Sequence, residues 1–152
     1  MEAGVVVDAG VSAGVTAALA SVTGLVDELA GVVAFPPAAL DGPTRVPDAD
    51  ADPLQDSSAA CLDGLGVVAR LEAATAALKV RLVAAYAEAA DAMEGPAASA
   101  YEATAREVSK VAEVACALTI GERAASALLG ETHALTTSLP AALNALQTGA
   151  MG

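Results

Sequence analysis

Few side chains in this sequence have the types and spacing that catalysis or metal binding requires. The one histidine is His133, and the two cysteines are Cys61 and Cys116. A zinc site needs four nitrogen, sulfur or oxygen ligands, and these three residues show none of the paired spacings that such sites use. Gly64-Leu65-Gly66 lies inside a helical pattern and lacks the full phosphate-binding fingerprint. We therefore predict no catalytic residue, no metal site and no cofactor.

The basic residues point to a second kind of chemistry, the binding of nucleic-acid phosphates. Residues 108–135 show a helix, a tight polar break and a second helix, a pattern compatible with a helix-turn-helix. The stretch 101–140 has a charge balance of −2, whereas phosphate-binding surfaces usually gather several cations. Helical bundles without DNA show the same pattern, so both interpretations stay open. The candidate DNA contacts are Arg106, Lys110, Arg123 and His133.

The elements that carry these residues are expected to be helices. The chain has 152 residues, is 55% hydrophobic through much alanine, and contains two Tyr, one Phe and no Trp. Alanine is the best helix former, and Leu, Glu and Arg follow closely. The composition therefore predicts an all-α fold with a core of Leu, Val and Ala.

Charge and the N-terminal sequence bear on location. The net charge is −12, which disfavours anionic lipid surfaces and DNA backbones. No Lys or Arg precedes Arg45, so a secretory signal is not expected, and the stretch 9–26 is weakly hydrophobic for a membrane span. We predict a cytoplasmic protein without a membrane partner, in which Cys61 and Cys116 are buried, reduced thiols.

The first 56 residues divide into two parts. An apolar stripe at spacings of three and four predicts a helix within residues 1–34, from about Ala13 to Ala34, which Phe35-Pro36-Pro37 ends. Residues 35–56 are rich in Pro and Asp and predict an extended acidic linker. Residues 1–56 together have a net charge of −8.

Residues 57–152 are predicted to form the main helical domain, a bundle of one long helix and three shorter ones. The long helix covers about 57–93 and ends at Gly95-Pro96. The shorter helices run from Ser99 or Thr104 to Leu118, from Thr119 to Thr136, and from about Ser138 to Gly149, the first two being the helix-turn-helix-like pair. The predicted inward face of the long helix comprises Leu62, Leu65, Val68, Leu71, Leu78, Leu82 and Ala85.

Residues 57–152 also resemble a known family. The most specific part is Ser138-Leu139-Pro140-Ala141-Ala142-Leu143-Asn144-Ala145-Leu146-Gln147-Thr148-Gly149, preceded by Ala117-Leu118-Thr119-Ile120 and His133-Ala134-Leu135. These motifs are similar to those of the actinobacterial helical domain of unknown function found before HNH endonuclease domains, a family that includes the mycobacterial thirteen-E-twelve repeat proteins. The resemblance implies an all-α domain attached to a nuclease that acts on DNA.

Two functions follow from these observations. The first is a non-catalytic helical assembly or DNA-positioning module of an HNH-endonuclease-like protein, without the nuclease site itself. The alternative is a stand-alone α-helical interaction or oligomerisation protein unconnected with DNA. A small-residue face on the long helix predicts either a homodimer or another helical partner, or packing inside the chain. This face comprises Ala69, Ala73, Ala76, Ala77, Ala84 and Ala87.

Overall fold

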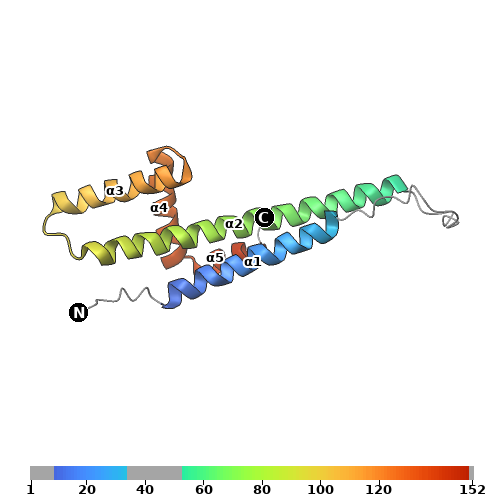
Figure 1. The fold of residues 1–152 in the computed structure, drawn as a ribbon, viewed down its shortest axis with the longest axis horizontal. Coiled ribbons are helices and arrows are strands. Elements are labelled where there is room, and N and C mark those ends of the chain that lie inside the picture. Colours follow the sequence, from blue (N-terminus) through green and yellow to red (C-terminus); the bar gives the residue numbers. More distant parts are fainter. Residues whose placement is uncertain (1–8, 34–52, 151–152) are drawn as a thin grey trace.

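The computed structural model describes residues 9–33 and 53–150, and within these ranges the chain is built from α-helices without strands (Figure 1). The all-α prediction is confirmed. Of the predicted linker at 35–56, residues 35–52 lie outside the described residues, and the prediction of an extended chain is wrong at 53–56, which are helical. The helices are α1 (Ala9–Val33), α2 (Pro53–Glu94), α3 (Ala100–Leu118), α4 (Glu122–Thr137) and α5 (Pro140–Gln147).

The long helix α2 is the axis on which the other helices are arranged (Figure 1). Its 42 residues span about 63 Å at 1.5 Å per residue. Helix α1 runs antiparallel along it, since Gly14 lies beside Arg81 whereas Glu28 lies beside Arg70. After α2 the chain turns back into α3, and α4 and α5 then return to α2. Thus α2 contacts every other described helix.

Local sequence signals explain most helix ends. Helix α2 begins at Pro53, four residues before the expected start at Ser57. A proline is tolerated at the first helical position, because an N–H would have no partner within the helix there. The helix can therefore begin at Pro53, inside the predicted acidic linker. The helix ends before Gly95, whose φ of 66° is the left-handed conformation that favours glycine. Helix α3 starts after Ser99, whose Oγ accepts a hydrogen bond from the Glu102 backbone N–H at 3.1 Å.

The junction between α3 and α4 differs from the prediction. Thr119 was expected to cap the start of α4, but it ends α3 in a left-handed conformation with a φ of 54°. The N–H groups of Thr119 and Ile120 bond the Cys116 and Ala115 carbonyls, so they satisfy the end of α3. Helix α4 is instead preceded by Gly121, which has no side chain to form a cap.

The buried core consists largely of small side chains. On α2 the buried residues are Val67, Ala73, Ala74, Ala77, Val80 and Val83. The predicted leucine face is wrong at Leu62, Leu65 and Leu82, which are 66%, 63% and 50% exposed. Small side chains let neighbouring helices approach closely. Helices α1, α4 and α5 all pack against α2, whose buried residues are alanine and valine. Of the predicted alanine face, Ala73 and Ala77 are buried within the chain, whereas Ala69 and Ala76 are exposed.

Two arginines of α2 fasten the neighbouring helices. Arg70 Nη2 lies 2.6 Å from Glu28 Oε1 of α1. Arg81 donates hydrogen bonds to Gln147 Oε1 and Asn144 Oδ1 of α5, both at 2.9 Å, and its guanidinium also lies against Gly14 of α1. A Cβ on Gly14 would come within 2.7 Å of Arg81 Nη1, so glycine leaves room for this guanidinium.

Helix α1 has an unusual composition for a surface helix. Its segment Ala13–Val32 is long and apolar enough to cross a membrane by length and composition, and 6% of it is buried. The overlapping stretch 9–26 is weakly hydrophobic for a membrane span. In the described structure α1 lies along α2, with Ala18 fully buried and Leu19 and Val26 about half exposed.

Candidate functional site

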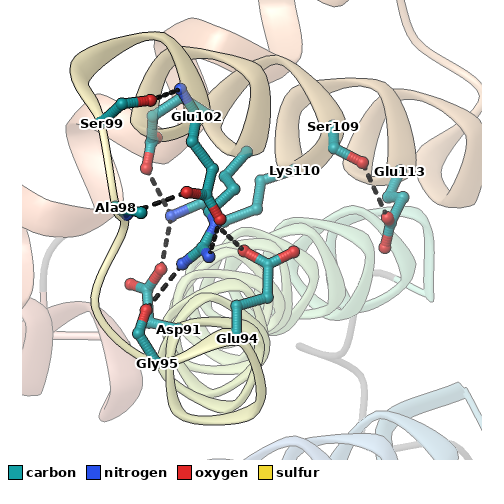
Figure 2. A network of polar contacts seen from close by, with 11 residues as sticks. Asp91, Glu94, Gly95, Ala98, Ser99, Glu102, Ser109, Lys110 and Glu113 are labelled. Atoms are coloured by element: carbon teal, nitrogen blue, oxygen red, sulfur yellow. Dashed lines mark hydrogen bonds and ion pairs between the residues drawn. The ribbon is translucent and has the colours of Figure 1, made fainter.

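A cluster of charged side chains joins α2 to the start of α3 (Figure 2). Lys110 Nζ of α3 lies 2.9 Å from Asp91 Oδ1 of α2 and also pairs with Glu107. Arg106 pairs with Glu94 and Glu102 and donates a 2.6 Å hydrogen bond to the Gly95 carbonyl oxygen. Two of the four predicted DNA contacts, Arg106 and Lys110, are therefore engaged within the chain.

The surroundings of Lys110 and Glu102 shift the pKa of each group toward its charged form. Burial alone would lower the pKa of Lys110, but hydrogen bonds from its ammonium to Glu107 and Asp91 outweigh burial and raise it. The pKa of Glu102 is lowered because its carboxylate accepts a hydrogen bond from the Ala98 backbone N–H and another from Arg106. Both shifts favour the charged forms, so the cluster holds α3 against the end of α2.

Arg123 and His133, the other two predicted contacts, are exposed on α4. They line a cleft of about 790 Å³ between α2, α3 and α4, and Lys110 lines it too. Three carboxylates, those of Asp91, Glu107 and Glu122, line the same cleft. The structure thus brings three of the four candidates together, but among equal numbers of acids. Such a surface offers no continuous track for a phosphate backbone.

A second concavity was not predicted from the sequence. A groove of about 530 Å³ separates α2 from α3, and its lining is almost entirely apolar. Thr75, Lys79, Tyr86 and Glu113 supply its polar atoms. Leu78, Leu82 and Tyr86 are spaced by four residues, and the sequence predicts Leu78 and Leu82 on the inward face of the long helix. The apolar lining consists of Leu78, Leu82, Val83, Val114, Ala117 and Leu118.

Tyr86 links the two walls of this groove. Its hydroxyl donates a 2.7 Å hydrogen bond to Glu113 Oε2, and the Ser109 hydroxyl donates to Glu113 Oε1 at 3.3 Å. Burial, followed by the hydrogen bond and the charge of Glu113, raises the pKa of Tyr86 to about 12. The neutral phenol is therefore the form that joins α2 to α3.

We expect this phenol to titrate near pH 12 rather than 10. Because the folded-state pKa is raised, the stabilisation from Tyr86 is present below pH 10 and is lost as the pH rises toward 12. Ultraviolet absorbance of tyrosinate in a Tyr101→Phe background would follow Tyr86 alone. Adding Glu113→Gln should bring the midpoint part of the way back, since burial remains. A midpoint at 10 in the Tyr101→Phe protein would contradict the described contact.

The remaining candidates for chemistry stand apart from one another. Cys61 and Cys116 are free, as predicted, but both are exposed, so the expectation of burial is wrong. They occupy the outer faces of α2 and α3, because alanine and valine fill the helix contacts instead. Among the described residues, no group of three or more His, Cys, Asp or Glu side chains is placed to hold a metal ion.

No protein-family model, no curated protein and no solved structure matches the chain. The cleft, the groove and the charge distribution are therefore the observations that bear on function.

Proposed function

We propose that this chain is a non-catalytic helical assembly module of an HNH-endonuclease-like protein, which positions a nuclease by contacts with protein rather than with DNA. The observation that carries the proposal is that most of the described Lys and Arg side chains bind other side chains of the same chain. Arg70, Arg106 and Lys110 are in ion pairs, and Arg81 is bonded to two side-chain amides. Among the described cations, this leaves Lys79 and Arg123 without such a partner.

Two uncommitted cations among the described residues are few for DNA binding by phosphate contacts. Each phosphate contact contributes to a salt-dependent affinity, and DNA-binding proteins commonly make several such contacts. Lys79 lies at the groove between α2 and α3, whereas Arg123 lines the cleft beside α4. The apolar groove is one described surface that suits a protein ligand.

The connection to a nuclease rests on the resemblance of residues 57–152 to the helical domain that precedes HNH endonucleases. The DNA that follows the codon for Gly152 tests this connection. A His-Asn-His cluster encoded in frame would support it. Without a nuclease encoded there or nearby, the alternative is favoured, namely a stand-alone helical interaction protein. The groove supports that alternative equally, because binding another protein needs no nuclease.

We expect the pure chain neither to cut nor to retain DNA. Supercoiled plasmid incubated with the protein and Mg²⁺, Mn²⁺ or Zn²⁺ should stay intact, because His133 is the chain's one histidine. A short duplex should show no mobility shift at physiological salt. A Lys79→Glu/Arg123→Glu variant is the matched control and should behave identically.

Two results would refute the proposed function. One is metal-dependent nicking that persists through further purification. The other is duplex binding that weakens with salt and disappears in the double variant, since that would make Lys79 and Arg123 phosphate contacts.

A further inference from the structure

We infer that the turn between α3 and α4 is a strained hinge, and that its opening exchanges α4 and α5 between two copies of the chain. In the opened form α3 and α4 join into one continuous helix, and the α4–α5 pair packs on α2 of the second copy. This inference goes beyond the proposed function and does not depend on it, because it concerns contacts between copies of the chain and involves neither a nuclease nor DNA.

The strain lies at Thr119, where α4 turns from the end of α3 toward α2 (Figure 1). Thr119 is the one described residue other than glycine with a positive φ, and its φ of 54° and ψ of 44° are left-handed. In this conformation an L side chain crowds the following carbonyl oxygen, and for a β-branched residue it is a true outlier. Glycine is the usual residue at this position. The closed turn is therefore less stable than the same turn built with glycine.

The start of α4 also favours the opened form. Gly121 precedes α4 and supplies no side-chain cap for its first N–H groups. In a continuous helix the N–H groups of Glu122 and Arg123 would instead bond backbone carbonyls at the end of α3. Packing does not hold the turn itself, since Thr119, Ile120 and Gly121 are all exposed. Short hinge loops under strain are the places where domain swapping is expected.

The contacts between α3 and α4 identify a second copy as the partner. Val114 and Ala115 of α3 are buried in one cluster with Ala125 of α4, and Leu118 and Leu128 pack against it. Opening the hinge in a single chain would expose this apolar cluster to water, which is unfavourable. A second copy presents the same α4 to the same α3, so the cluster re-forms between chains and needs no new surface.

Polar contacts outside the hinge keep α3 on its own α2 during the exchange. Lys110 pairs with Asp91, and Tyr86 donates a hydrogen bond to Glu113. The exchanged unit is α4 with α5, which contact each other and reach α2 through the cluster around Leu143. Each copy has a net charge of −12, which opposes pairing, so moderate salt favours the dimer by screening this repulsion.

Three variants test the hinge by sedimentation of the full chain, refolded from urea at high and at low protein concentration. Thr119→Gly relieves the closed turn and weakens the continuous helix, so the association constant should fall about a hundredfold, or about tenfold for each of the two hinges in a dimer. Gly121→Ala should raise it about twentyfold, because alanine favours the continuous helix. A Cβ at Gly121 meets nothing within 4 Å, so the closed form also accepts this change.

Gly130→Ala is the matched control. Gly130 lies within α4, where a Cβ also meets nothing within 4 Å. Alanine there stabilises α4 equally in the closed and opened forms, so the association constant should stay within about twofold of the unmodified chain. Thermal unfolding of all three variants would verify that each is folded.

Spin labels distinguish a swapped dimer from side-by-side association. The exposed Tyr101 and Ser138 would carry the labels, as Tyr101→Cys and Ser138→Cys in a chain with Cys61→Ser and Cys116→Ser. One straight helix would place these positions about 55 Å apart, and the bend between α3 and α4 makes the distance shorter in the closed chain. Electron double resonance on labelled chains diluted with unlabelled ones should show the long distance in the dimer and the short one in the monomer.

Four results would overturn the inference. They are a chain that stays monomeric after refolding at high concentration, a dimer that keeps the short distance, and equal effects of Gly121→Ala and Gly130→Ala on association. The fourth is a dimer weakened by Ala76→Leu and unchanged by Thr119→Gly, which would place the interface on the small-residue face of α2. None of these results bears on plasmid cleavage or duplex binding, so the proposed function stands or falls separately.

Discussion

Replacing Leu143 with alanine is expected to lower the free energy of unfolding by about 2–5 kcal/mol. Leu143 is 2% exposed and packs against Ala77 and Val80 of α2, with Leu135 and Leu146 beside it. Deleting its side chain removes apolar contacts and leaves a cavity that neighbouring alanine cannot fill. Because α5 has only eight residues, it depends on this contact to remain on α2.

Urea unfolding followed by circular dichroism would measure the loss. Leu139→Ala is the matched control, since Leu139 is 53% exposed and immediately precedes the same helix, and it should change stability by less than about 0.5 kcal/mol. Equal small effects of the two substitutions would mean that α5 is not anchored by Leu143.

The opposite change, Ala77→Leu, is expected to destabilise the protein by about 1–3 kcal/mol. Ala77 is fully buried where α5 meets α2. A leucine there would have to displace Leu143 or move α5 outward, because no open space surrounds a side chain with no exposed surface. Thermal unfolding of the purified variant would measure the effect.

Ala76→Leu provides the control one residue away. Ala76 is exposed, so the larger side chain should have little effect on stability, within about 0.5 kcal/mol. The same variant examines the predicted self-association through the small-residue face of α2. If Ala76 lay in a dimer interface, a leucine would block close approach, and sedimentation would show a weaker dimer. Equal destabilisation by both substitutions would contradict the described burial of Ala77.

Some helix ends could be predicted because particular residues mark them. Ser99 with Glu102, Gly95-Pro96 and Pro140 act within one turn, so their effect is visible in the sequence. The buried face of α2 could not be predicted in the same way. Hydrophobicity favours Leu62 and Leu65 over Ala74 and Ala77, but burial depends on where other helices approach. The buried positions of α2 are alanine and valine because these small side chains allow the neighbouring helices to approach closely.

The candidate site shows the same division between local and distant effects. Arg106 and Lys110 seemed available for DNA when only their own helix was considered. Their partners Asp91 and Glu94 belong to the preceding helix, and the turn at Gly95 brings them near. The apolar groove arises from the relative placement of α2 and α3, and the four-residue spacing of Leu78, Leu82 and Tyr86 marks only its α2 wall.

The two arginines of α2 have a consequence for the alignment of α1. The facing surfaces of α1 and α2 are rich in alanine, glycine and valine, and such repetitive surfaces would fit nearly as well after a slide of one or two turns. Arg81 lies against Gly14, where a side chain would have to displace its guanidinium, and Arg70 pairs with Glu28. These two positions on α1 are roughly 21 Å apart. Together these two contacts favour the observed register of α1 on α2 over registers shifted by one or two turns.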